Sequence, residues 1–126
     1  MQPLSVVIAQ PDLRTASQLA ASMRTRFRNV AVTQEKENLR AEILKSRAAL
    51  AVVDLELLPL PEVKELCREL NNVRVVCTHR IADEKLWAAV LGAGAEDCCT
   101  AGDIPGIISA AERSLIPRAL AKAKAA

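Results

Sequence analysis

Five short apolar runs recur along the chain at nearly regular intervals. Four of them are continuous rather than alternating with polar positions, which is typical of strands that are covered on both faces. They predict strands over residues 4–9, 30–33, 50–54 and 73–77, and the run DCCT predicts a fifth over 97–100. The strand starts lie 20 to 26 residues apart, which leaves room for one right-handed crossover helix in each interval.

The segments between these runs carry apolar residues at helical spacing. The predicted apolar faces are, from the first helix to the fifth, Leu13, Ala16, Leu19, Ala20, Met23 and Phe27; Leu39, Ile43 and Leu44; Val63, Leu66, Cys67 and Leu70; Leu86, Ala89, Val90 and Ala93; and Ile104, Ile107, Ile108, Ala111 and Leu115. Asp12 and Asp103 are suited to cap the first and last helices, and Gly92 and Gly94 to end the fourth. The pattern predicts a doubly wound α/β domain with five parallel strands.

The composition fits one globular domain and narrows its partners. The chain has 126 residues, 51% of them hydrophobic and 25% charged, which excludes disorder as its main state. The 17 basic and 15 acidic residues give a net charge of +2, too small a bias to indicate nucleic-acid or membrane partners. Aromatic residues are limited to Phe27 and Trp87, so base stacking lacks its main side chains.

The four cysteines are expected to be thiols. The N-terminal residues do not form a secretory signal and no apolar run approaches a membrane span, so we expect a cytoplasmic protein. Cys77, His79, Cys98 and Cys99 suggest a mixed thiolate and imidazole site, but neighbouring strand residues point to opposite faces of a sheet. We therefore favour buried small hydrophobic residues over a metal or redox site, and assign His79 no catalytic role.

Ligands of open parallel sheets bind beyond the carboxyl ends of the strands. The side chains expected there are Gln10, Pro11, Asp12, Asp54, Thr78, His79, Thr100 and Ala101. Three passages around these positions form a recognisable set. They are VVDLELLPLP, which contains the end of the third strand, VVCTHRIADEK, which contains the end of the fourth, and VLGAGAEDCCTAGD around the fifth.

Through these passages the chain resembles the receiver domain of two-component response regulators over residues 4–115. The third passage is similar to a family segment that reads EAGADDYLTKPF. The resemblance implies a flavodoxin-like (βα)5 fold with strand order 2-1-3-4-5, a domain over residues 1–116, and a helix end or linker over 117–126. It also implies a non-enzymatic role in phosphorelay signal transduction, with a histidine kinase or an output domain as partner.

The resemblance assigns family roles to two of the strand-end residues. In receivers an Asp that ends the third strand accepts a phosphoryl group, two acidic residues after the first strand hold Mg²⁺, a Ser or Thr after the fourth strand contacts the phosphoryl group, and a Lys after the fifth clamps it. Asp54 matches the phosphoacceptor and Thr78 the switch hydroxyl. Without the resemblance, Asp54 is equally well explained as a solvated strand-end carboxylate, and Thr78 as a residue that satisfies a local backbone group in a turn.

Four positions depart from the family pattern. The acidic pair falls on Gln10 and Pro11, the clamping Lys falls on Ala101, and the aromatic switch residue of the fifth strand falls on Cys98. Aspartyl phosphorylation depends on Mg²⁺ and a cationic side chain to offset the charge that develops. We therefore expect weak or absent phosphorylation and a degenerate, pseudo-receiver-like domain that acts by protein-protein interaction.

Two alternatives stay open at this point. One is an ordinary phosphoprotein receiver in which Asp12 and Asp54 hold Mg²⁺, although Asp12 also suits a helix N-cap. The other, from a different class, is a flavodoxin-like protein that binds a small molecule. The chain has no glycine-rich phosphate loop, and the strand-end loops are short for wrapping a cofactor. No cofactor is expected apart from Mg²⁺ at those two carboxylates.

Two surface features are also candidates for contacts. Trp87, near the start of the fourth helix, is either an interface anchor or a packing residue. In the family, helix four, strand five and helix five form a surface that pairs with a partner or a second copy, so a homodimer through these elements is one expectation. Arg24, Arg26 and Arg28 suit a phosphate-binding patch, but a solvated helix end explains them more simply.

Overall fold

Five parallel strands form the centre of the molecule in the order β2-β1-β3-β4-β5. The computed structural model describes residues 2–115. The strands are β1 (Gln2–Ala9), β2 (Phe27–Thr33), β3 (Leu50–Asp54), β4 (Arg74–His79) and β5 (Asp97–Thr100). The predicted fold class and strand order are therefore confirmed, including the short fifth strand. The predicted helix end or linker over residues 117–126 lies outside the described residues.

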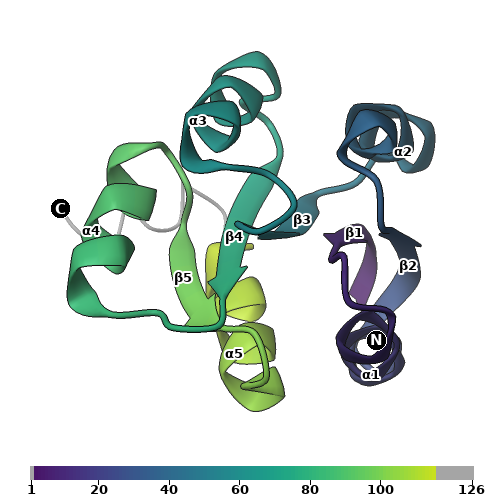
Figure 1. Cartoon of the computed structure of the whole chain (residues 1–126). Helices are drawn as coiled ribbons and strands as arrows, with labels where there is room; N and C mark the ends of the chain where they lie inside the picture. The colour runs from purple at the N-terminus through teal and green to yellow at the C-terminus, as the bar shows by residue number, and fades with distance from the viewer. Residues whose placement is uncertain (1, 116–126) are drawn as a thin grey trace, which may run out of the picture.

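Helices cover both faces of the sheet (Figure 1). The helices are α1 (Leu13–Met23), α2 (Leu39–Ser46) with the preceding 3-10 turn η1 (Lys36–Asn38), α3 (Leu60–Glu69), α4 (Glu84–Gly92) and α5 (Ile104–Ser114). One apolar core lies between the sheet and α2, α3 and α4, and the other lies between the sheet and α1 and α5. Because β1 pairs with β3 and β3 with β4 in parallel, the carboxyl ends of these three strands lie together at one edge of the sheet.

The central strand β3 shows why its sequence is a continuous apolar run. All five of its residues are buried. Leu50 and Val52 face the core under α1 and α5, whereas Ala51 and Val53 face the core under α2, α3 and α4. Because both faces are covered, apolar side chains are required at successive positions rather than at alternate ones.

The first helix is shorter than its apolar pattern predicted. α1 ends at Met23, and Phe27 begins β2, where its side chain is completely buried. A turn after the helix, in which the Thr25 hydroxyl donates to the backbone oxygen of Ser22, redirects the chain. Phe27 therefore reaches the same core from a strand, which the helical spacing could not distinguish.

Three further predictions about helix faces are wrong. Leu13 of α1 is 62% exposed, Leu44 of α2 is 65% exposed, and Ala89 of α4 is also exposed, so none of the three contributes to a core. Of the three arginines interpreted as one helix end, two follow α1 directly and one does not. Arg24 is the C-cap of α1, Arg26 lies in the turn after it and pairs with Glu112 of α5 across 3.7 Å, and Arg28 lies on β2.

The expected caps are present. The Asp12 side chain accepts from the backbone N–H of Thr15, and the Asp103 side chain accepts from that of Gly106. Gly94 follows α4 with φ +106°, a left-handed conformation that a side chain would strain. These local signals fix where the helices begin and end.

Candidate functional site

Three buried polar side chains meet where β1, β3 and β4 end. Asp54 is the last residue of β3 and pairs in register with Thr78 of β4, and Gln10 directly follows β1. Their exposed fractions are 2% for Asp54, 2% for Thr78 and 5% for Gln10. A buried charged or polar group is costly unless it is hydrogen-bonded, so the partners of each atom decide what this cluster can do.

The Asp54 carboxylate accepts three hydrogen bonds. Oδ2 accepts from Gln10 Nε2 at 3.1 Å and from the Thr78 hydroxyl at 2.9 Å. Oδ1 accepts from the backbone N–H of Glu56 at 2.9 Å. Within residues 2–115, no buried side-chain nitrogen or oxygen lacks a hydrogen-bond partner. The carboxylate is therefore held entirely by neutral donors of the protein.

The orientation of the Gln10 amide follows from its second contact. Its Oε1 accepts from the backbone N–H of Asp12 at 3.0 Å. Because a backbone N–H can only donate, the oxygen of the amide must face Asp12 and the nitrogen must face Asp54. Gln10 thus joins the loop after β1 to the carboxylate of β3. This role was missed at the sequence level, where Gln10 counted only as a lost charge.

Asp12 does not take part in this cluster through its side chain. Its carboxylate is exposed and bonds to Thr15, accepting from the hydroxyl and, at 3.0 Å, from the backbone N–H. These hydrogen bonds hold the pKa of the Asp12 carboxyl below its usual value. Pro11 is exposed, and its backbone oxygen accepts from Gln34 Nε2 at 3.1 Å. Of the two carboxylates considered as ligands, one is therefore buried and one caps a helix.

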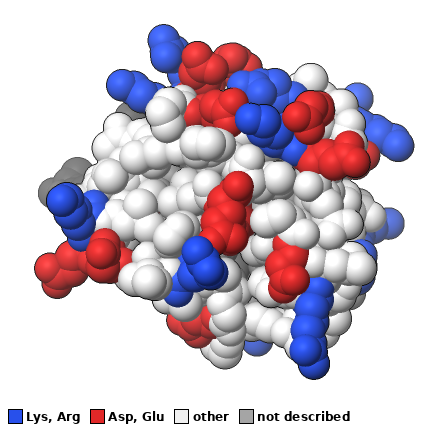
Figure 2. Space-filling view, viewed as in Figure 1, with Lys and Arg blue, Asp and Glu red and all other residues white. Residues whose placement is uncertain are grey.

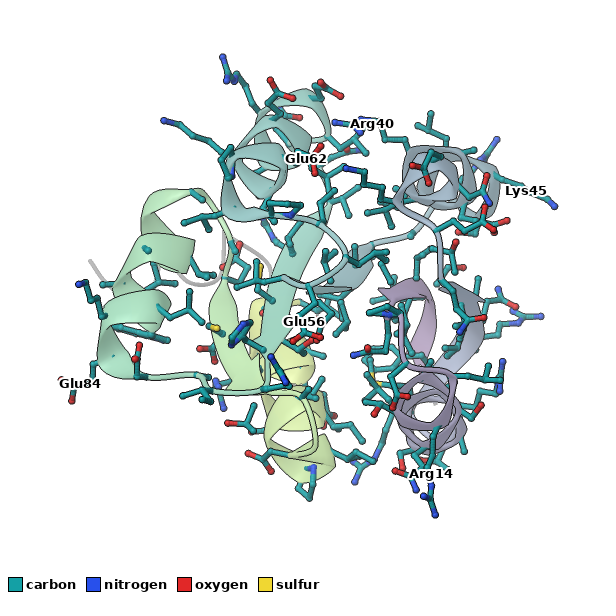
Figure 3. All side chains as sticks on the ribbon, in the orientation of Figure 1. Arg14, Arg40, Lys45, Glu56, Glu62 and Glu84 are labelled. Atoms are coloured by element: carbon teal, nitrogen blue, oxygen red, sulfur yellow. The ribbon has the colours of Figure 1, made fainter. Side chains whose placement is uncertain are left out.

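The positions that receivers use on β5 carry no charge or aromatic ring here. Ala101 is half-buried, and its backbone N–H donates to the His79 oxygen at 2.9 Å. The side chain of Cys98 is buried in the core under α4. Two residues after Asp54, Glu56 forms an ion pair with Arg80, whose Nε lies 2.6 Å from Glu56 Oε1. In Figure 3, Glu56 is labelled near the centre of the view. This ion pair was not predicted from the sequence.

Two of the four cysteines, Cys77 and Cys98, are buried, and Cys67 and Cys99 are half-buried. Cys77 and Cys98 belong to the core under α2, α3 and α4, whereas Cys99 packs against the core under α1 and α5. Burial raises the pKa of Cys77, and raises the pKa of both Cys98 and Cys99 to about 11. The side chains of Cys98 and Cys99 are thus on opposite faces, as the strand pattern predicted. His79 Nδ1 lies 3.1 Å from the backbone nitrogen and oxygen of Ile81.

Trp87 belongs to a network on the surface of α4, β5 and α5. Trp87 is 47% exposed, and its indole Nε1 donates to Asp97 Oδ1 at 3.0 Å. The other oxygen of Asp97 accepts from Arg113 Nη2 at 2.9 Å. Nearby in the chain, Ile81 is 71% exposed. Trp87 is therefore not a core residue, and its hydrogen bond to Asp97 joins α4 to β5. Its role as an interface anchor stays a prediction.

The fold is that of response-regulator receiver domains. One similar solved structure is an orphan response regulator of H. pylori, with a TM-score of 0.78 and 14% identity over 90% of this chain and 97% of that chain. A response regulator from Thermotoga maritima has a TM-score of 0.76 and 16% identity over 91% of this chain and 98% of that chain. A response regulator protein from Burkholderia pseudomallei with a phosphorylated aspartic acid and a calcium ion has a TM-score of 0.74 and 16% identity over 98% of this chain and 73% of that chain. No protein-family model and no curated protein matches the chain. None of the described helices is long and apolar enough to cross a membrane.

Proposed function

We propose that this domain is a cytoplasmic receiver-type signalling module that acts by protein-protein contact rather than as an enzyme, and in which Asp54 accepts little or no phosphate. The observation that carries the proposal is the hydrogen bond from Gln10 Nε2 to Asp54 Oδ2. A neutral amide stands against the oxygen that would otherwise face a metal ion or a phosphoryl group. The receiver fold supports a signalling role, and the buried cluster around Asp54 supports weak or absent phosphorylation.

Asp54 would be the nucleophile in phosphorylation, and its carboxylate is poorly available. Phosphorylation would form a bond from an Asp54 oxygen to phosphorus while the bond from phosphorus to the donor breaks. Oδ2 already accepts two hydrogen bonds and Oδ1 accepts one, and the residue is 2% exposed. A carboxylate in this state has few free lone pairs and little contact with solvent. Its attack on an anionic phosphoryl group is therefore disfavoured.

The residues around Asp54 are also poorly suited to bind the Mg²⁺ that phosphorylation requires. Mg²⁺ binds oxygen ligands in near-octahedral geometry, with one or two protein carboxylates and several waters. Here Gln10 directs nitrogen at Asp54 and uses its oxygen for the backbone of Asp12, while the Asp12 carboxylate caps α1. The donor set around Asp54 therefore does not fit Mg²⁺. Ala101 also leaves the developing charge without a lysine.

The contact between Thr78 and Asp54 bears on how the domain signals to a partner. The Thr78 hydroxyl already contacts Asp54 at 2.9 Å, so the two strand ends are joined with no phosphoryl group between them. We infer that the domain stays in one state and is regulated by binding. The surface formed by Trp87, Asp97 and Arg113 is our candidate contact for an output domain, a histidine kinase or a second copy of the chain.

The proposal is tested by incubating the protein with acetyl phosphate and Mg²⁺ and measuring its intact mass under conditions that preserve acyl phosphates. We expect no mass increase that depends on Asp54. Asp54→Asn is the control, and a phosphorylatable receiver is treated in parallel. A stoichiometric adduct that is lost in Asp54→Asn would contradict the proposal and favour the ordinary receiver with Asp12 and Asp54 as ligands.

A further inference from the structure

The charged side chains of α3 are divided between its two sides. Toward α2, Glu62 lies 3.2 Å from the Lys36 ammonium, and Glu69 lies 2.8 Å from Arg40 Nε. Figure 3 shows Arg40 and Glu62 in the space between α2 and α3. Lys64 and Arg68 of α3 line hollows on the opposite side, next to α4. Neither of these two cations has an ion-pair partner within residues 2–115.

The two hollows join into one groove between α3 and α4, here called the α3–α4 groove. The first, of about 390 Å³, is lined by Leu60, Pro61, Lys64, Ala89, Gly92 and Ala93. The second, of about 370 Å³, shares Lys64 and Ala93 with the first and is also lined by Arg68, Arg74 and Glu96. The groove therefore has an apolar half and a basic half. Among the described lining residues the one carboxylate is Glu96, which lies 3.7 Å from Arg74, so Lys64 and Arg68 have no ion-pair partner within residues 2–115.

The α4 wall of the groove is unusual for a surface helix. Residues 86–95, LWAAVLGAGA, contain no charged side chain, and Ala88, Ala89 and Gly92 are exposed. A helix that is apolar on all sides is normally buried. A Cβ atom added at Gly92 would meet no heavy atom within 4 Å, so the groove is open at that point. Figure 2 shows uncharged surface between the charged side chains of α3 and those at the start of α4.

We propose that the α3–α4 groove binds an acidic segment of a partner protein, with apolar side chains against Ala89 and Gly92 and carboxylates on Lys64 and Arg68. The apolar floor together with two unpaired cations complements a segment in which apolar and acidic residues alternate. A nucleic acid fits less well, because the groove offers few cations and no aromatic ring for base stacking. The groove is separate from Asp54, so the inference does not depend on whether Asp54 is phosphorylated.

The test uses fluorescence anisotropy with a labelled peptide built from repeats of Leu-Glu-Glu-Leu-Leu-Glu-Glu. Its counterpart has Lys in place of every Glu, and a labelled single-stranded DNA oligomer forms a third arm. We expect the acidic peptide to bind, with amide NMR shifts concentrated at Ala89 and Gly92 and with affinity that falls as salt rises. The Lys peptide and the DNA are expected to bind more weakly.

Charge-reversal variants locate the contact. Lys64→Glu with Arg68→Glu is expected to weaken binding of the acidic peptide by about tenfold or more, since two favourable pairs become repulsive. Arg14→Glu with Lys45→Glu makes the same change in net charge at two exposed cations on other helices, which point away from the groove in Figure 3, and should leave binding unchanged. Gly92→Gln, which fills the groove with a neutral side chain, should also weaken binding.

Four results would overturn the inference. They are no binding of the acidic peptide, equal binding of the two peptides, equal loss in both charge-reversed variants, and tighter binding of the DNA. Circular dichroism and thermal unfolding of each variant show whether the fold is kept. Because Gly92→Gln changes no charge, its result stands even where charge reversal destabilises α3.

Discussion

Polar side chains are buried and hydrogen-bonded in the strand-end cluster of Gln10, Asp54 and Thr78, whereas the charged side chains of Lys64 and Arg68 in the α3–α4 groove are exposed. At the strand ends, the Asp54 carboxylate is buried and every one of its hydrogen bonds comes from Gln10, Thr78 or Glu56 of the same chain. In the groove, Lys64 and Arg68 are exposed beside an apolar helix surface that no element within residues 2–115 covers. The Asp54 position, where receivers are phosphorylated, is therefore inaccessible in this domain, whereas the groove between α3 and α4 is accessible to a partner.

The largest expected effect is on the alkylation rate of Cys98 and Cys99, which tests whether the inside of the domain is inaccessible. Burial raises the pKa of Cys98 and of Cys99 to about 11, so only a small fraction of either is thiolate at pH 8. We expect alkylation by iodoacetamide at that pH to be about a hundredfold slower than for an unperturbed thiol. Peptide mass spectrometry of the folded protein measures this rate, and the protein in urea is the control. Fast labelling of Cys98 in the folded protein would mean that the interior is not closed.

Removing the Gln10 amide should have the next largest effect. Gln10→Leu takes a donor from the buried Asp54 carboxylate and an acceptor from the backbone of Asp12. We expect the free energy of unfolding to fall by about 2 kcal/mol, because a buried charged group loses a hydrogen bond. Urea denaturation measures the change. Gln18→Leu, at an exposed position of α1, should change stability by less than about 0.5 kcal/mol. Equal effects of the two substitutions would show that Gln10 does not stabilise Asp54.

Two glycines at the end of α4 provide a smaller contrast. Gly94 has φ +106°, and a Cβ atom there would lie 3.1 Å from Cys67 Cβ, so Gly94→Ala should cost about 1.5 kcal/mol. Gly92 is the last residue of α4 and has open space around it, so Gly92→Ala should be neutral or stabilise by up to about 0.5 kcal/mol. Thermal unfolding compares the pair. A cost at Gly92 as large as at Gly94 would contradict the open groove.

The smallest effect is expected at the Trp87 surface. Asp97→Ala removes the acceptor of the indole N–H and the partner of Arg113, whose side chain is 61% exposed. Exposed pairs contribute little, so the loss should stay below about 1 kcal/mol. Acrylamide quenching of Trp87 fluorescence should increase because the ring loses its anchor. A loss above about 2 kcal/mol would indicate that this network supports the fold and is not merely a contact surface.

Local sequence determined most of the fold. Continuous apolar runs predicted β3 and the interior of β1 because both faces of these strands are covered. The prediction failed at Phe27, whose spacing fits the α1 face equally well. A side chain at the end of α1 and one at the start of β2 both reach the same core, so only the direction of the chain after Met23 distinguishes the two. Asp97–Thr100 formed a strand despite its polar residues because β4 pairs with it in parallel register.

The candidate site was only partly predictable. Its position followed from the rule for parallel sheets, which brought together Asp54, Thr78 and Gln10. The role of Gln10 depends on the direction of its amide, which is fixed by a backbone group in the next loop and leaves no signal in the sequence. The α3–α4 groove likewise depends on how two consecutive helices, separated in the chain by β4, are spaced on the sheet. The uncharged run of residues 86–95 was its one local sign.

The most direct measurement is a titration of the protein with beryllofluoride in the presence of Mg²⁺, followed by amide NMR signals of Asp54 and Thr78. Beryllofluoride mimics a phosphoryl group on a carboxylate that can accept one. With the Asp54 oxygens already bonded to Gln10, Thr78 and Glu56, we expect no saturable change in these signals. Saturable shifts at both residues that disappear in Asp54→Asn would contradict the claim that the amide of Gln10 closes this site.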